Sequence, residues 1–336
     1  MSPLVASPSR VVVTGGAGYI GSHAVRSLVE AGHAVAVLDD LSAGHPESLP
    51  AGVPLVRAAI HDHAAVRRLL VDHRADAVMH FAAWLKVGES VQKPVEYYQN
   101  NVVGTLAVLG AMRDAGVKRF IFSSTCAVYG EPSSVPIVET LDTHPINAYG
   151  ESKLAIERAL PHLEVAYGIK WMALRYFNAA GAWPDGSIGE DHADEIHLIP
   201  LAIRAAIGGP PLKVFGEDYP TPDGTCLRDY IHVCDLASAH MCALEALGRG
   251  VPSGAYNIGT GTPQSVKSVI DTVGRVVGRP VAWQSAPRRP GDPAVLYASS
   301  DRAQRELGWR PQHAELDAIV RHAWQWHSTH PRGYAG

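Results

Sequence analysis

The stretch Val11-Val12-Val13-Thr14-Gly15-Gly16-Ala17-Gly18-Tyr19-Ile20-Gly21 decides the fold. A run of β-branched residues leads into glycines spaced Gly15-x-x-Gly18-x-x-Gly21, and an amphipathic pattern typical of a helix follows from about residue 19 to residue 31. A glycine-rich turn between a strand and a helix lets backbone N–H groups approach a pyrophosphate, and the helix N-terminus adds positive potential. The stretch therefore predicts a dinucleotide site near the start of the chain.

The next apolar run, residues 34–38, ends in two acidic residues. Asp39 stands 18 residues after Gly21, where an aspartate accepts hydrogen bonds from the adenosine ribose hydroxyls. Asp40 follows at once and no arginine adjoins the pair. Because two negative charges would repel a 2′-phosphate, the sequence favours NAD over NADP.

Further apolar runs indicate four more strands, at residues 54–60, 77–81, 119–124 and 170–176. Helical patterns near 95–115 and 148–167, and a helix with Asp62 as its N-cap, separate them. Continuous apolar strands that alternate with helices predict an α/β fold with a doubly wound, parallel Rossmann-type sheet. We expect an NAD-binding Rossmann domain over 1–178, with returning segments near 229–259, and a smaller, loop-rich α/β substrate domain over 179–336.

The composition excludes several classes of protein. The 336 residues are 46% hydrophobic and 18% charged, as in a globular protein, and the net charge of −4 gives no pull toward nucleic acid or a membrane. The four cysteines lack Cys-x-x-Cys spacing and indicate reduced thiols of a cytoplasmic protein. Despite 17 histidines, no His-Glu-x-x-His or paired His/Cys motif occurs, so no metal site is expected. The first ten residues do not resemble a signal peptide, and no apolar run is long enough to span a bilayer.

Three side chains predict the catalytic group. Tyr149 and Lys153 are four residues apart, which puts them on one face of a helix. An ammonium beside a phenol favours the phenolate, so we expect Lys153 to lower the pKa of Tyr149 and make it a proton-transfer residue. Thr125 follows the strand at 119–124, at the sheet edge where ligands bind, and its hydroxyl can bond the reacting oxygen.

Taken together, these motifs resemble the extended short-chain dehydrogenase/reductases and, within them, the UDP-glucose 4-epimerases. The resemblance covers nearly the whole chain. It is carried by the glycine stretch from Val13, by Val-Gly-Glu-Ser-Val from Val87, by Ser-Ser-Thr-Cys-Ala-Val-Tyr-Gly from Ser123, by Tyr149 to Lys153 and by Arg-Tyr-Phe-Asn from Arg175. Two longer motifs are more specific, namely Gly-Glu-Asp-Tyr-Pro-Thr-Pro-Asp-Gly-Thr-Cys-Leu-Arg-Asp-Tyr-Ile-His-Val from Gly216 and Arg-Arg-Pro-Gly-Asp-Pro from Arg288.

The resemblance implies roles for individual residues. Tyr149 would be the acid/base, Lys153 would tune it and bind the nicotinamide ribose, and Thr125 would bond the sugar O4. NAD would contact Gly15, Gly18, Tyr19, Ile20, Gly21, Asp39, Asp40, Ser42, Ile60, Phe81, Ala82, Ala83, Asn100, Ser123, Tyr149, Lys153 and Tyr176. The UDP-sugar would contact Thr125, Asn178, His197, Leu198 and Phe215 (the last two at the uracil), Arg228 and Arg289 (at the diphosphate), Asp292 (at the uridine ribose) and Leu296 (at the sugar).

The sequence departs from the pattern of these relatives in three ways, one of which is His197, at a position that is Asn in some members and His in others. Ala59 replaces an aspartate that contacts adenine in many of them, and Leu85 stands where a lysine is common, with Lys86 one residue later. Leu296 is smaller than the tyrosine that restricts some members to unacetylated sugars, so N-acetylhexosamines are expected to fit as well.

Other functions remain open from the sequence. The alternatives are an epimerase acting on a pentose pair and a nucleotide-sugar dehydratase or reductase. A 4,6-dehydratase needs an acidic pair after Thr125, where Cys126 and Ala127 stand instead. A non-catalytic NAD sensor would usually lack the tyrosine or the lysine. A homodimer through the helices near 95–115 and 148–167 is expected from the resemblance.

Overall fold

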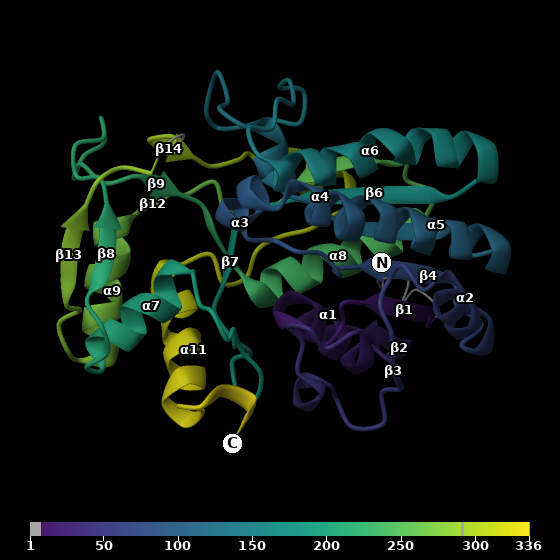
Figure 1. Ribbon diagram of the computed structural model, residues 1–336, viewed down its shortest axis with the longest axis horizontal. Coiled ribbons are helices and arrows are strands. Elements are labelled where there is room, and N and C mark those ends of the chain that lie inside the picture. Colours follow the sequence, from purple (N-terminus) through teal and green to yellow (C-terminus); the bar gives the residue numbers. More distant parts are fainter. Residues whose placement is uncertain (1–7, 290–291, 336) are drawn as a thin grey trace, which may run out of the picture.

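A computed structural model describes residues 8–289 and 292–335 of the chain. Figure 1 shows a large sheet between helices on the right and a smaller group of strands and helices on the left. Within the described residues the large sheet has seven parallel strands in the order β11-β6-β5-β4-β1-β2-β3. These are β1 (Arg10–Thr14), β2 (Ala34–Asp39), β3 (Leu55–Arg57), β4 (Ala77–His80), β5 (Arg119–Ser123), β6 (Lys170–Arg175) and β11 (Gly254–Asn257).

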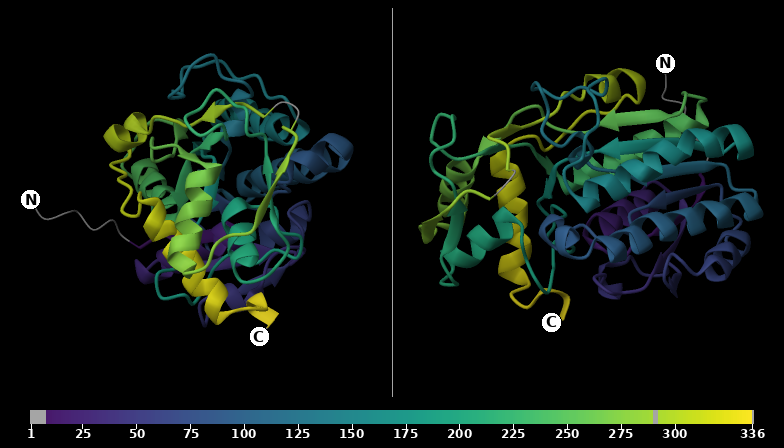
Figure 2. Two further views of the ribbon diagram at one scale, coloured as in Figure 1. Left: turned by 90° about the vertical axis from the view of Figure 1, so that its left-hand side faces the viewer. Right: turned by 45° about the horizontal axis from the view of Figure 1, so that its top comes forward.

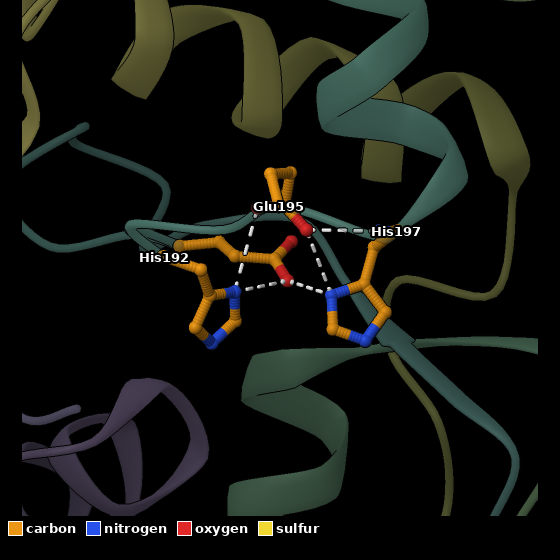
Figure 3. A group of neighbouring side chains, drawn as sticks. His192, Glu195 and His197 are labelled. Carbon is orange, nitrogen blue, oxygen red and sulfur yellow. Dashed lines mark hydrogen bonds and ion pairs between the residues drawn. The ribbon is translucent and has the colours of Figure 1, made fainter. Parts of the chain in front are cut away.

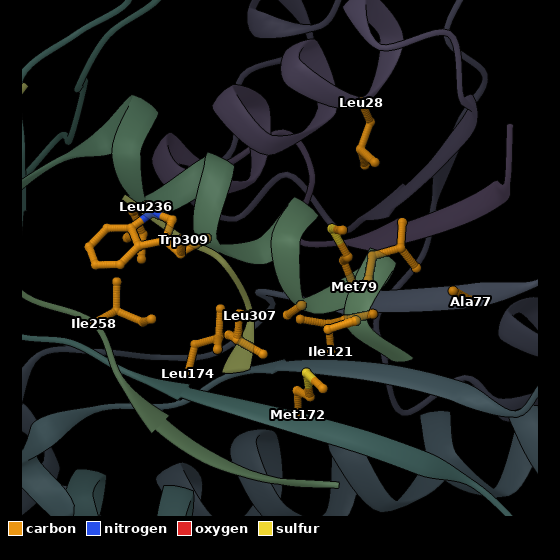
Figure 4. Close-up of a cluster of buried hydrophobic side chains, with 14 of the residues drawn as sticks. Leu28, Ala77, Met79, Ile121, Met172, Leu174, Leu236, Ile258, Leu307 and Trp309 are labelled. Atoms are coloured by element: carbon orange, nitrogen blue, oxygen red, sulfur yellow. The ribbon is translucent and has the colours of Figure 1, made fainter. Parts of the chain in front are cut away.

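Alternate strand residues pack against helices on opposite faces of this sheet. Val11 and Val13 of β1 face α1 (Tyr19–Glu30) and α8 (Val233–Gly248), in the core drawn in Figure 4. Val12 faces α2 (His63–Asp72), α5 (Gly104–Ala115) and α6 (Ala148–Tyr167). Helices on both faces of a parallel sheet confirm the predicted doubly wound α/β fold.

Two elements differ from their predicted extent. The third strand, predicted over residues 54–60, ends at Arg57. Ala58 N–H still donates to the Asp39 carbonyl at 3.1 Å, and the chain then leaves the sheet. The helix expected near 95–115 is divided into α4 (Pro94–Tyr97), the π-helical segment η2 (Tyr98–Val103) and α5, and α3 (Val87–Gln92) precedes it. Within η2, the Asn101 side chain bonds both backbone groups of Trp84, at 2.9 and 3.0 Å, and so holds the wall of a cleft described below.

The smaller part is built on a core that includes Ile203, Val214, Val269 and Val320. Here α11 packs against α7 and α9, and it lies between the β8–β13 pair and the large sheet in Figure 1 and in the right view of Figure 2. The elements of this part are β7 (Asn178–Ala180), α7 (Leu198–Ala206), β8 (Leu212–Phe215), β9 (Leu227–Arg228), β10 (Tyr230–His232), β12 (Gln264–Ser265), α9 (Val266–Val277), β13 (Trp283–Ala286), β14 (Val295–Leu296) and α11 (Leu316–Thr329).

The chain passes between the two parts more than once. After β10 it returns to the large sheet as α8 and β11, and α10 (Asp301–Glu306) leads to Leu307 and Trp309, which are buried in the same core as α8. Short 3-10 turns complete the elements: η1 (Pro46–Ser48), η3 (Cys126–Tyr129) and η4 (Gly333–Ala335). In the part of the chain that the structure describes, no helix combines the length and hydrophobicity needed to cross a membrane.

Candidate active site

One cleft of about 1560 Å³ collects every residue that the sequence assigned to cofactor or substrate. The carboxyl ends of β1, β2, β4, β5 and β6 form one side, where Gly15, Asp39, Phe81, Ser123 and Tyr176 line it. The other side comes from the smaller part of the molecule. A cleft at the carboxyl ends of parallel strands is where ligands bind in doubly wound folds.

The three glycines before α1 differ in their surroundings. Gly15 has φ +72°, and a Cβ on it would lie 2.4 Å from the Ala82 nitrogen; a Cβ on Gly21 would lie 2.0 Å from the Gly15 carbonyl oxygen. The nearest atom to a Cβ on Gly18 would be 3.5 Å away. Gly15 therefore makes the tight turn, Gly21 allows close packing, and Gly18 leaves the backbone open to a ligand.

The first turn of α1 and Asp39 lie beside this turn. Gly18 occupies the N-cap of α1 and has no side chain to satisfy the helix N–H groups. Asp39 is buried, and its carboxylate accepts from the backbone of Ala17 at 3.0 Å and of Leu41 at 2.9 Å. Burial raises its pKa, and these two hydrogen bonds oppose the rise. The turn thus offers N–H donors for a pyrophosphate and a fixed carboxylate for a ribose.

Tyr149 and Lys153 come from the first turns of α6, which starts because the Asn147 side chain accepts from Gly150 N–H at 2.8 Å. Lys153 is buried, and its Nζ donates to the Ser123 carbonyl at 2.8 Å. Thr125 follows β5, and its Oγ1 accepts from Ala127 N–H at 3.1 Å. The predicted trio therefore lines one part of the cleft.

The prediction that Lys153 lowers the pKa of Tyr149 is wrong for the chain by itself. Burial raises the pKa of Tyr149 to about 12, against a smaller lowering by a hydrogen bond with Thr125. Burial also lowers the pKa of Lys153 to about 7, with Glu157 opposing. A lysine that is partly neutral near pH 7 supplies little charge to stabilise a phenolate, so desolvation dominates at both residues.

Glu157 and Arg175 form a buried ion pair that the sequence did not indicate, next to the segments that carry Thr125 and Lys153. Glu157 and Arg175 are buried, and the Arg175 guanidinium donates to both carboxylate oxygens of Glu157. Ser124 Oγ donates to Glu157 at 2.5 Å, and Arg175 donates to the Tyr129 hydroxyl at 2.7 Å. These residues tie α6 to β5 and β6, and they hold Lys153 and Thr125 in their relative positions.

On the far side of the cleft, the predicted diphosphate residues already have partners. Arg228 pairs with Asp292, and the Arg289 guanidinium lies 4.1 Å from the centroid of the Phe215 ring. Leu296 in β14 is paired with Arg228 in β9. Pro290 and Gly291 of the motif from Arg288 lie outside the described residues. The two arginines give this end of the cleft a cationic character suited to phosphate oxygens.

Of the departures noted from the sequence, Leu85 lines the cleft after β4, together with Lys86. Ala59 is not among the lining residues, although its neighbours Ala58 and Ile60 are. Lys86 Nζ lies 2.7 Å from a carboxylate oxygen of Asp194, so it joins the wall after β4 to the loop before α7.

That loop carries a group of four charged side chains, of which the sequence indicated only His197. Figure 3 shows His192 and His197 turned toward carboxylate oxygens that lie between them, with Glu195 beside both. The Nδ1 atoms of both histidines also lie close to Oε1 of Glu190. Burial would lower the pKa of His197, but the two carboxylates outweigh it and raise that pKa to about 10. In the same way they raise the pKa of His192 to about 9.

The fold and the cleft together are those of a dinucleotide-binding α/β enzyme. The chain belongs to the NAD dependent epimerase/dehydratase family, whose model matches residues 11–259. A UDP-glucose 4-epimerase of Halalkalibacterium halodurans is 50% identical over 326 residues, which are 97% of each chain.

Solved structures agree. A UDP-glucose 4-epimerase from Brucella ovis in complex with NAD is 46% identical with a TM-score of 0.91, over 93% of this chain and 96% of that one. A UDP-Glc/GlcNAc 4-epimerase from Campylobacter jejuni is 39% identical with a TM-score of 0.84, over 96% and 99%.

Proposed function

We propose that this chain is an isomerase that interconverts UDP-glucose and UDP-galactose with NAD, by inversion at C4 of the sugar. The observation that carries the proposal is that one cleft holds the glycine turn, Tyr149 with Thr125, and both arginines. Its volume exceeds the several hundred Å³ of an ordinary small-molecule pocket, as a site for two nucleotides requires. UDP-glucose 4-epimerases are similar to nearly the whole length of this chain, which supports the same reaction.

The residues present fit NAD. The open backbone at Gly18 and the first turn of α1 suit its pyrophosphate, and Asp39 suits its adenosine ribose. Lys153, beside Ser123, would bind the nicotinamide ribose. When bound, NAD would supply a reversible hydride acceptor for C4 of the sugar.

Tyr149 would move the proton at O4 of the sugar. As the phenolate, it would take the proton from the 4-hydroxyl group as a 4-keto sugar forms, and as the resulting phenol it would return the proton to O4 after the sugar has turned over. Thr125 would hydrogen-bond the same oxygen and so align it with the phenol. Burial raises the pKa of Tyr149 to about 12 in the chain alone, and the positive charge of a bound oxidised cofactor would lower it.

Arg228 and Arg289 would hold the diphosphate while the sugar rotates. Forked guanidinium groups bind phosphate oxygens at two points, which fixes the UDP and leaves the sugar attached by single bonds. To bind in this way, Arg228 must contact the diphosphate while it stays paired with Asp292, and Arg289 must contact it from its position over the Phe215 ring. Leu296 lines the sugar end of the cleft, where its side chain would leave space for an N-acetyl group.

The test uses UDP-galactose carrying deuterium at C4. We expect UDP-glucose that retains the deuterium at C4, without added oxidant or reductant, because the same hydrogen returns to the carbon it left. Transfer of the label to C6 of a 4-keto-6-deoxy product would instead indicate a dehydratase, and a stable 4-keto product that has lost the label would indicate a net redox reaction.

A homodimer and a cytoplasmic location also belong to this proposal. Val91, Val95, Val103 and Leu106, on α3, α4, η2 and α5, are between 42% and 67% exposed, and an apolar surface of this kind supports association. Light scattering after gel filtration tests it: we expect twice the chain mass, and a monomer for Val103→Glu would assign the interface to this surface.

A further inference from the structure

The loop between β7 and α7 brings together four side chains that can bind a metal ion. It has no helix or strand from residue 181 to residue 197. One ligand atom each from Glu190, His192, Glu195 and His197 lies within 4.8 Å of the other three. The sequence concealed this group, because its Glu-x-His-x-x-Glu-x-His spacing matches no common metal motif.

Three of the four imidazole–carboxylate separations between donor atoms, from 3.1 to 3.4 Å, are close to those in a tetrahedral site. His197 Nδ1 lies 2.6 Å from Glu190 Oε1 and 3.1 Å from Glu195 Oε1. His192 Nδ1 lies 3.3 Å from Glu190 Oε1 and 3.4 Å from Glu195 Oε2. Ligands bound to Zn²⁺ at about 2.0–2.1 Å in a tetrahedron are about 3.3 Å apart.

Hydrogen bonding does not account for the position of Glu190 Oε1, the oxygen that both imidazoles approach. Glu190 is 3% exposed, and its Oε1 has no hydrogen-bond partner of acceptable geometry among the described residues, although two imidazole nitrogens approach it. Glu195 is held in place, since its Oε1 accepts from the backbone of Ile196 and His197 at 2.8 Å each. In the metal-free chain these two carboxylates are paired with the two imidazoles, so a divalent cation would take the place of the imidazole protons.

We propose that Glu190, His192, Glu195 and His197 form a binding site for one divalent first-row transition metal ion, with Zn²⁺ as the reference ion. Two imidazoles and two carboxylates are ligands that Zn²⁺, Co²⁺ and their neighbours accept, whereas Ca²⁺ and Mg²⁺ prefer six or more oxygens. Both histidines bind through Nδ1, which leaves the other nitrogen of each ring for a partner in the cleft.

A metal at this point would stiffen one wall of the cleft. His197 directly precedes Leu198, the first residue of α7, and both line the cleft. The ring centroids of His192 and Tyr19 are 6.4 Å apart in an edge contact, so the site also adjoins the start of α1. The ion would therefore link the loop before α7 to the glycine turn of the large sheet.

The experiment measures metal binding without substrate, so its result does not depend on the proposed reaction. Untagged protein, with whatever nucleotide it retains, is stripped with a chelator and then titrated with Zn²⁺ and, separately, with Co²⁺. We expect one Zn²⁺ per chain by elemental analysis after gel filtration, and visible Co²⁺ absorption bands of the intensity typical of a tetrahedral site.

Two variants test the ligands and one serves as a control. His192→Gln should bind at least about tenfold more weakly, and His192→Cys should restore binding and add a thiolate charge-transfer band with Co²⁺. His322→Gln is the matched control, because His322 belongs to a separate histidine cluster with His232 and His313. Far-UV circular dichroism checks that each variant is folded.

Several results would overturn the proposal. These are a wild-type protein that retains no stoichiometric metal and shows no tetrahedral Co²⁺ spectrum, equal binding by wild type and His192→Gln, or loss of binding in His322→Gln. In the first case the group is a set of His–Glu ion pairs and nothing more.

Discussion

Replacement of Lys153 with methionine should change how the stability of the protein depends on pH. Lys153 is 4% exposed, and burial lowers the pKa of its amine from 10.5 to about 7. The unfolded chain therefore binds this proton more tightly than the folded chain does. Between pH 7 and 10.5 the unfolded state holds more protons, so stability rises with pH in the wild type.

The expected magnitude follows from the two pKa values. The full difference corresponds to roughly 5 kcal/mol, present as a penalty below pH 7 and gone above pH 10.5. Between pH 6.5 and 9.5 the free energy of unfolding of the wild type should rise by about 3 kcal/mol relative to Lys153→Met. Loss of the hydrogen bond to the Ser123 carbonyl adds an offset that does not vary with pH.

Urea unfolding at several pH values measures this difference on nucleotide-free wild type and Lys153→Met. Titrating groups common to both proteins cancel in the comparison. Lys118→Met is the control, since Lys118 is exposed, and its difference from wild type should be flat. A flat difference for Lys153→Met, or one in which the wild type loses stability as pH rises, would refute the assignment of a buried, partly neutral lysine.

Three further outcomes are expected. Tyr149→Phe should lower kcat by about 10²–10⁴ with little change in KM, because an acid/base group is lost; Tyr167→Phe, on the same helix, should keep wild-type rates, and equal rates for both variants would remove Tyr149 from the mechanism. Glu157→Gln should reduce stability by about 3–5 kcal/mol in urea unfolding, because Arg175 stays buried without its carboxylate; an unchanged midpoint would contradict this. Leu296→Tyr should lower turnover of UDP-N-acetylglucosamine more than that of UDP-glucose, and a parallel loss on both substrates would show that residue 296 does not control the fit of the acetyl group.

Much of the large sheet was predictable because its signals are local. The apolar run before Gly15, the alternation of strands and helices, and Asp62 at a helix start are each encoded within a few residues. The smaller part was harder to predict, because its strands of two to four residues depend on pairing with distant segments, as β14 does with β9. No local pattern indicates that Trp309 is buried against α8.

The site shows the same division. Motifs and family resemblance identified residues that line a single cleft, but they did not show how those residues are electrostatically tuned. The sequence places Lys153 one turn from Tyr149, which favours a phenolate; burial of both side chains, visible only in three dimensions, reverses the expected shift in the Tyr149 pKa. Likewise, Glu157 and Arg175 are 18 residues apart, and only packing shows that they are partners.

The central claim, that the chain epimerises a UDP-sugar at C4 with a retained cofactor, has a direct test. Purified protein is incubated with UDP-galactose and no added nucleotide, and the products are separated by chromatography. The account predicts UDP-glucose, formed to a constant product ratio that is also reached from the opposite direction. Unchanged UDP-galactose, with and without added NAD, would contradict it.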